Sequence, residues 1–266
     1  MYTPTRSSWL PFLFRSHLPQ TLGRTALLAT ILGLLLGINI LICSLCLARY
    51  VDIITLQISF LSNDRLQLIW QWSAYWSALC IFHLMEFFTT AIWNPTVATA
   101  TSFLVNHSQS YTAAALVSWT EFWIRFLWFS AWNFPLASTG GVLLVVAAQA
   151  IRSTAMIHCG ESFNHIIQRN KKENHVLVTT GIYSLLRHPS YVGFFYWSVG
   201  TQLILGNPLS LVAYTAASWV FFRKRIPYEE GSLQNLFRDD YSEYAKRTWM
   251  GIPFIPSCAV DRSKEE

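Results

Sequence analysis

Five consecutive residues, Arg187-His188-Pro189-Ser190-Tyr191, place a cation, an imidazole and a proline directly before the aromatic apolar run VGFFYW. Proline is favoured at the first position of a helix, because the N–H that it lacks would be unpaired there. His188 is therefore the predicted cap and Pro189 the predicted first residue of a helix. The free N–H groups and partial positive charge of a helix start suit a carboxylate or phosphate, and Arg187 adds a full charge. The same residues would also serve as a basic anchor at a membrane surface.

A second cluster follows the last apolar run, where three cations and two carboxylates fall within Arg223–Glu230. Arg225 and Glu229 are four residues apart, which is the spacing of neighbours on one helix face. Pro227 lies between them and removes one helical hydrogen bond, so we expect the helix to kink or restart there. A bend at this place would let a pocket open.

Polar side chains also gather at the end of the apolar segment 139–168. Asn164 and Gln168 are four residues apart, and His165 and Gln168 are three apart, so these side chains would share a helix face. The stretch His175–Tyr183 follows. Three polar clusters thus lie in the C-terminal half of the chain, where together they could hold a polar ligand.

The composition indicates the surroundings of these clusters. Of the 266 residues, 53% are hydrophobic and only 12% are charged, whereas a soluble domain averages about 25% charged residues. The 12 Trp and 11 Tyr suit a protein that meets membrane–water interfaces. We therefore predict an all-α, polytopic integral membrane protein with about seven or eight transmembrane helices and a cytosol-facing C-terminal region.

Seven apolar segments are candidate spans, because about 20 apolar residues at 1.5 Å per residue cross a bilayer. They are Thr25–Ala48, Val51–Ser62, Leu66–Trp93, Thr112–Trp132, Thr139–Gln168, Tyr191–Leu205 and Leu209–Phe222. Val51–Ser62 is short, and Thr139–Gln168 could continue beyond the bilayer as one helix. Gly206-Asn207-Pro208 predicts a tight hairpin between the last two segments.

Basic residues predict the orientation of the chain. Lysines and arginines fill the polar stretches of the last hundred residues, so that face is expected to be cytosolic. The N-terminal tail is also basic. Both ends on one side require an even number of crossings, so the count of seven conflicts with the charge pattern by one.

Two pairs of ionisable residues fall inside predicted spans, where a charge costs at least about 2.5–3.5 kcal/mol and therefore pairs or lines a cavity. Glu121 and Arg125 are four residues apart, which favours a structural ion pair between them. His83 and Glu86 are three residues apart, and they likewise could pair with each other or line a cavity. The CxxC at residues 43–46 lies in an apolar run with no second pair, so no metal site is predicted.

Longer motifs follow one another in the C-terminal part of the chain: HVLVTTGIY, RHPSYVGFFYWSVGTQLILGNP, FFRKRIPYEEGSL, YSEYAKR and GIPFIP. In this order they resemble the isoprenylcysteine carboxyl methyltransferase family, and the earlier stretch NPTVATATSFLVNHSQSYTAAALVSWTEF is similar to it as well. The resemblance covers roughly residues 83–256. Because the motifs are long, ordered and unbroken, the resemblance is specific.

The resemblance implies methyl transfer from S-adenosylmethionine to the C-terminal carboxylate of a prenylated cysteine in processed CaaX proteins, at the endoplasmic reticulum membrane. The implied partners are farnesylated or geranylgeranylated proteins such as small GTPases, and membrane lipid, without nucleic acid. We expect N-terminal transmembrane helices at residues 1–110 and a catalytic transmembrane core with interfacial helices at 111–266, in one continuous membrane domain.

Carried onto this chain, the resemblance assigns the substrate carboxylate to Arg225. It implies a cofactor pocket formed by Gln168, His175, Val176, Leu177, Val178, Tyr183, His188, Pro189, Ser190, Tyr191 and Glu229. The sequence has no glycine-rich dinucleotide fingerprint, so the fold of soluble methyltransferases is not expected.

The residue types suit the implied reaction. A terminal carboxylate, with a pKa of about 3.5, is ionised at neutral pH and needs no general base. One bidentate arginine can aim it at a methyl group. Aromatic rings suit a sulfonium, so Tyr183, Tyr191, Phe194 and Phe195 could line the cofactor or the lipid side. For the two phenylalanines, an ordinary lipid-facing position is the alternative.

Three other functions are compatible with parts of the sequence. A membrane sterol or isoprenoid reductase using NADPH has a similar RHP helix start and an acidic stretch followed by tyrosine. A phospholipid methyltransferase would share the methyl donor, and a non-catalytic scaffold or transporter is the third. The order FFRKRIPYEE favours the methyltransferase. Polar clusters at one end, and not at the bilayer midplane, argue against transport.

Overall fold

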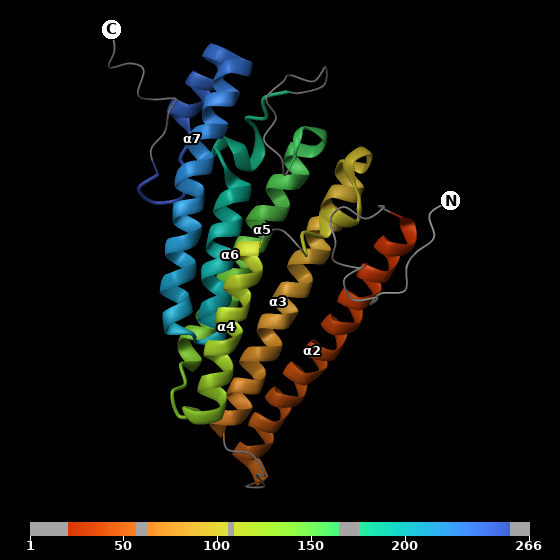
Figure 1. The fold of residues 1–266 in the computed structure, drawn as a ribbon, viewed down its shortest axis with the longest axis vertical. Helices are drawn as coiled ribbons and strands as arrows, with labels where there is room; N and C mark the ends of the chain where they lie inside the picture. Colours follow the sequence, from red (N-terminus) through yellow and green to blue (C-terminus); the bar gives the residue numbers. More distant parts are fainter. Residues whose placement is uncertain (1–20, 57–62, 106–108, 165–175, 256–266) are drawn as a thin grey trace.

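The structure, a computed structural model, describes residues 21–56, 63–105, 109–164 and 176–255. Six long helices run along one axis of this part of the chain (Figure 1). They are α2 (Leu22–Leu56), α3 (Asn63–Trp93), α4 (Gln109–Trp128), α5 (Pro135–Cys159), α6 (Pro189–Leu205) and α7 (Pro208–Arg247). Short 3-10 turns connect them: η1 (Pro95–Val97), η2 (Ala100–Phe103), η3 (Gly160–Ser162) and η4 (Gly181–Ser184). The described residues contain no β-strand, so the all-α prediction is confirmed.

Three of the described helical segments are long and apolar enough to cross a membrane: Leu22–Arg49, Asp64–Trp93 and Pro135–Ser162. The spans predicted at Thr25–Ala48 and Leu66–Trp93 lie inside the first two. A separate span beginning at Val51 was wrong, because residues 51–56 continue α2. The predicted seven or eight spans are therefore not confirmed by the described residues, which form six long helices.

Helix α5 is shorter than the sequence predicted. A single helix was expected to reach Gln168, but α5 ends at Cys159. Gly160 caps it with φ 50° and ψ −127°, a backbone conformation that glycine adopts easily and other residues rarely do. The short turn η3 follows, so Asn164 does not lie on a continuation of α5. Gln168, which was expected to share a helix face with Asn164, lies outside the described residues.

The predicted hairpin between the last two apolar segments is confirmed. Gly206 ends α6 in the left-handed conformation with φ 67°, Asn207 caps α7, and Pro208 is the first residue of α7. Helices α6 and α7 therefore run side by side in opposite directions (Figure 1).

The last helix was expected to kink or restart at Pro227, and a restart there was wrong. Helix α7 continues through Pro227, and its non-helical residue is Arg238, with φ 46° and ψ −120°. Ile226 and Glu230 are both fully buried on either side of Pro227. Tertiary packing therefore holds the helix where the proline removes one hydrogen bond.

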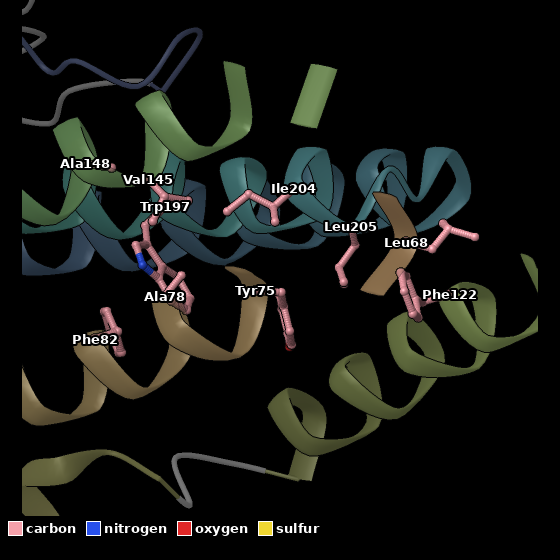
Figure 2. Close-up of a cluster of buried hydrophobic side chains, with 10 residues drawn as sticks. All are labelled: Leu68, Tyr75, Ala78, Phe82, Phe122, Val145, Ala148, Trp197, Ile204 and Leu205. Carbon is pink, nitrogen blue, oxygen red and sulfur yellow. The ribbon is translucent and has the colours of Figure 1, made fainter. Parts of the chain in front are cut away.

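The core is formed where α3, α4, α5 and α6 meet. Helices α5 and α6 approach closely at Gly193, where a Cβ atom would lie 2.8 Å from the carbonyl oxygen of Ala148. The ring centroids of Phe82 in α3 and Trp197 in α6 are 4.4 Å apart. Figure 2 shows the buried cluster, which comprises Leu68, Tyr75, Ala78, Phe82, Phe122, Val145, Ala148, Trp197, Ile204 and Leu205. This packing fixes the first residues of α6 against α5.

The sequence suggested that the two charged residues of α4 pair with each other. In the structure, both of them hold the α6–α7 hairpin. Arg125 donates hydrogen bonds to the carbonyl oxygens of Leu205 (2.7 Å) and Trp132 (2.8 Å). Glu121 accepts hydrogen bonds from the backbone N–H groups of Leu209 and Ser210, at the start of α7. A carboxylate at a helix N-terminus is favourable, because it satisfies unpaired N–H groups.

Candidate active site

A cavity opens at the end of the bundle where α5 ends and α6 begins. The residues that line it come from α3, α4, α5, α6, α7 and the segments between them. Ten of the predicted site residues are among them: Val176, Leu177, Val178, Tyr183, His188, Pro189, Ser190, Tyr191, Arg225 and Glu229. Gln168 and His175 lie outside the described residues. The structure thus brings the described candidates to one place, and their roles stay predictions.

The RHPSY motif forms the start of α6 as predicted. His188 is the cap residue and Pro189 the first helical residue. The imidazole of His188 stacks on the ring of Tyr191, with centroids 5.5 Å apart. The charge of Arg187, however, faces Glu230 at 3.6 Å, and both side chains are buried. Arg187 is therefore neutralised by a partner from α7, and the predicted anion-binding mouth does not have its full charge.

Arg225, Tyr191 and Glu229 form a chain of hydrogen bonds along the cavity wall. The guanidinium Nε of Arg225 donates to the Tyr191 hydroxyl at 2.8 Å, and that hydroxyl donates to Oε2 of Glu229 at 2.5 Å. The Arg225 guanidinium also lies over the Tyr191 ring, 5.4 Å from its centroid. The four-residue spacing of Arg225 and Glu229 therefore places a cation and a carboxylate on the same wall, connected by a phenol from α6.

A buried ion pair that sequence reasoning missed lies beside this chain. Arg152 of α5 binds Glu86 of α3 through two hydrogen bonds, and Glu86 is completely buried. Arg152 also donates to the hydroxyl of Ser190 at 3.0 Å, and it lines the cavity. The available signal was one arginine and one glutamate in two different apolar segments, because charges inside a membrane pair or line a cavity. The three-residue spacing pairs Glu86 with His83, but the His83 ring contacts the carbonyl oxygen of Phe103.

Apolar side chains also line the cavity: Phe82, Leu104, Phe194 and Phe221. They lie among its polar groups, because the Arg152 guanidinium is 5.4 Å from the Phe194 ring centroid and the Arg225 guanidinium is 5.8 Å from that of Phe221. Phe194 thus lines the cavity, and its contact with cofactor or lipid stays a prediction. Phe195 is instead buried in a cluster with Val192 and Phe222, which corrects its predicted position. The cavity therefore has both apolar and polar lining residues.

Two tyrosines beyond the break at Arg238 also line the cavity. The hydroxyl of Tyr244 donates to the carbonyl oxygen of Tyr183 at 2.8 Å, and both tyrosines line the cavity with Tyr241. Burial raises the pKa of the Tyr183 phenol, so this group stays protonated. Sequence reasoning gave Tyr241 and Tyr244 no role, because a helix expected to restart at Pro227 does not predict a reversal at Arg238.

Comparisons with known proteins match the region that holds this site. Residues 141–235 match the model of the isoprenylcysteine carboxyl methyltransferase (ICMT) family. A protein-S-isoprenylcysteine O-methyltransferase from Dictyostelium discoideum is 44% identical over 182 residues, which cover 68% of this chain and 76% of the relative. The chain belongs to the ICMT family. The matched model region contains Arg152 and both the RHPSY and RKRIPYEE motifs.

The fold of the chain is likewise that of an ICMT protein. A solved structure of the eukaryotic intramembrane Ras methyltransferase ICMT is similar with a TM-score of 0.70 and 44% identity, covering 72% of this chain and 69% of that one. The Xenopus laevis protein-S-isoprenylcysteine O-methyltransferase is 46% identical over 188 residues, or 70% of this chain. The match spans 65% of that ICMT relative's length.

Proposed function

We propose that this protein methylates the C-terminal carboxylate of prenylated cysteines in processed CaaX proteins, with S-adenosylmethionine as the methyl donor. The observation that carries the proposal is the wall formed by Arg225, Tyr191 and Glu229. It lies in a cavity that is lined by both polar and apolar side chains. A prenylated cysteine likewise has both kinds of group, with a carboxylate beside a long hydrocarbon chain.

The prenyl chain and the carboxylate of the substrate would bind to different residues of the cavity. The prenyl chain, farnesyl or geranylgeranyl, would lie against the apolar side chains of Phe82, Leu104 and Phe221. Its carboxylate would then reach Arg225, whose planar guanidinium can hold two oxygens at once. Small GTPases that end in a prenylated cysteine are the substrates we expect, with no nucleic acid involved.

The polar lining of the cavity suits the methyl donor. When bound, S-adenosylmethionine supplies a methyl group on a positively charged sulfur atom. Glu229 can accept hydrogen bonds from hydroxyl or amino groups, and the rings of Tyr183 and Tyr191 offer faces to a cation. The irregular segment 176–178 also lines the cavity. Among the described residues, the buried Tyr241 hydroxyl has no hydrogen-bond partner, and it lines the same cavity.

The residues of the chain act by orientation and by excluding water. Transfer forms a bond between carbon and a carboxylate oxygen, breaks the carbon–sulfur bond, and removes both charges. No proton has to move, because the carboxylate is already ionised at neutral pH. Arg225, fixed by Tyr191, aims the carboxylate, and Phe194 and Phe221 keep water from it. Removing water from around the carboxylate makes its oxygen a better nucleophile toward the methyl group.

We further propose an endoplasmic reticulum location with the cavity facing the cytosol. The basic residues around the cavity end of α7 support this orientation. Residues 1–110 would form supporting transmembrane helices and residues 111–266 the catalytic core. Phe82 and Leu104 of the first part also line the cavity, which supports one continuous membrane domain.

The purified protein in lipid nanodiscs tests this function directly. With radiolabelled S-adenosylmethionine, we expect methyl ester formation on N-acetyl-farnesylcysteine and none on N-acetylcysteine, which has the carboxylate but no prenyl chain. Binding of NADPH in place of S-adenosylmethionine, or equal methylation of both acceptors, would contradict the proposal.

A further inference from the structure

The segment after α7, Thr248–Ile255, turns back along the bundle; we call it the C-terminal segment. Its start is held at the level where α6 begins, because Trp249 donates its N–H to Leu185 and accepts the N–H of Arg187, both at 2.9 Å. Further along, the carbonyl oxygen of Gly251 accepts a hydrogen bond from the Tyr196 hydroxyl. The chain therefore descends beside the helices, as the dark blue trace next to α7 in Figure 1 shows.

The depth of this descent follows from helix geometry. Gly251 packs against Val192, which lies three residues after Pro189, the first residue of α6. At 1.5 Å per residue this contact is about 5 Å below the start of α6. The carbonyl oxygen of Pro253 then accepts a hydrogen bond from the indole N–H of Trp219, in the first half of α7. The C-terminal segment thus reaches from the cavity end to the middle part of the α6–α7 hairpin.

The C-terminal segment has two unlike faces. Ile252 and Ile255 are 2% and 9% exposed and pack in the cluster of Val192 and Phe222. On the other side Trp249 is 80% exposed and Phe254 is 91% exposed. Phe254 has a φ of 60°, which is rare for a residue other than glycine. Backbone hydrogen bonds on both sides of this segment therefore keep two large aromatic side chains facing outward.

The surroundings identify what covers these aromatic rings. The outer surface of α7 on the same hairpin is apolar, with Val212 70% exposed and Val220 46% exposed. Two exposed cations, Lys246 and Arg247, end α7 just before Trp249. Tryptophan at the interface, cations at the headgroups and apolar residues below them are the order found in proteins at a bilayer surface.

We propose that Trp249 and Phe254 insert into the cytosolic leaflet of the membrane, at the boundary between anionic headgroups and acyl chains. Interfacial elements bury their apolar face about 5–10 Å into this boundary, which matches the descent of the C-terminal segment. The proposal rests on the α6–α7 hairpin being embedded in the bilayer, and not on the methylation reaction.

Insertion would fix the level at which the cavity meets the lipid. The inner face of the C-terminal segment packs on Val192 and Phe222, and Phe222 also lines the cavity. One rigid cluster therefore connects the inserted rings to the cavity wall. A prenyl chain dissolved in the same leaflet would meet the cavity at a constant depth.

Cysteine labelling in nanodiscs that hold one copy each tests the insertion. The variant Phe254→Cys is compared with Asn235→Cys, an exposed position on the distal part of α7. A charged maleimide is added, and mass spectrometry follows each position separately from the native cysteines. We expect labelling at 254 to be about tenfold slower or more, because both the thiolate and the charged reagent need water. Equal labelling rates would overturn the proposal.

Photo-crosslinking shows whether lipid, protein or water contacts the side chain at position 254. Benzoylphenylalanine is placed at position 254 in the otherwise unchanged chain, and the nanodiscs contain a single phospholipid of known mass. Adducts with the mass of that lipid support insertion. Adducts with a peptide of this chain, or with water only, contradict it. Neither measurement needs substrate or methyl donor, so a failure of the proposed methylation would leave this result unaffected.

Discussion

At the hairpin turn, Arg125 donates to the carbonyl oxygens of Leu205 and Trp132, and it is 5% exposed. At the cavity, Arg225 donates to the Tyr191 phenol and also lines the open space. Both arginines follow apolar runs in the sequence, and both have a glutamate four residues away. The difference is in the acceptors: backbone oxygens enclose Arg125, whereas the cavity gives Arg225 room for a ligand.

The comparison shows how a buried charge can be interpreted. A charge whose donors end on the backbone of a turn holds that turn. A charge whose donors end on ionisable side chains at a cavity can exchange part of this contact for a ligand. Arg152 is intermediate, because it binds Glu86 and Ser190 and also lines the cavity.

The largest effect is expected from Arg125→Met. This change leaves two buried carbonyl oxygens without their charged donor and should lower the free energy of unfolding by about 3 kcal/mol. Thermal unfolding in detergent measures it, with Arg223→Met at an exposed site of α7 as the control. The remaining folded protein should bind S-adenosylmethionine normally. Unchanged stability would show that the turn does not depend on Arg125.

The second prediction concerns Arg225→Lys. A lysine keeps the charge but not the planar pair of donors that orients a carboxylate. Misplacing the carboxylate by about 1 Å should lower the methylation rate about a hundredfold. Stability and cofactor affinity should stay unchanged, as is also expected for the neighbouring control Arg223→Lys. Near-normal turnover on N-acetyl-farnesylcysteine would leave Arg225 as a membrane anchor only.

Much of the helical layout could be predicted from sequence, because it depends on local signals. Proline at the first position fixed the starts of α6 and α7, and Gly206 fixed the end of α6. Wrong expectations came where tertiary packing decides: Pro227 stays helical between buried Ile226 and Glu230. The reversal at Arg238 has no sequence signal that we recognised.

The candidate site could be predicted in part. The site residues that the family resemblance implied, as far as the structure describes them, line one cavity. The partners of these residues could not be found, because spacing along one helix says nothing about a neighbouring helix. Thus Glu86 was compared with His83, three residues away, whereas its partner Arg152 is on another helix. Arg187 likewise has its partner Glu230 on α7.

Glu229→Gln should act on the cofactor more than on the prenyl substrate. The amide can no longer accept two charge-assisted hydrogen bonds, which should weaken S-adenosylmethionine binding about tenfold. Isothermal titration gives the affinity, and Glu243→Gln, at an exposed position of distal α7, is the matched control. An unchanged affinity together with lost turnover would assign Glu229 to substrate or to Tyr191 alone.

The smallest effect separates two tyrosines of the same helix face. The Tyr244 hydroxyl donates to the carbonyl oxygen of Tyr183, whereas the buried Tyr241 hydroxyl has no hydrogen-bond partner among the described residues. Tyr244→Phe should therefore cost about 1 kcal/mol of stability and leave the affinity for S-adenosylmethionine unchanged. Tyr241→Phe should leave stability unchanged or slightly increased.

If the Tyr241 hydroxyl contacts the cofactor, Tyr241→Phe should weaken its binding by about fivefold, the value of one neutral hydrogen bond. Thermal unfolding and titration on the same samples measure both quantities for each variant. The opposite pattern, with stability lost at Tyr241 and affinity lost at Tyr244, would mean that Tyr241 belongs with Arg125 among the groups that hold the fold. Removing a hydroxyl lowers cofactor affinity without lowering protein stability only when the hydrogen-bond partner of that hydroxyl is the cofactor.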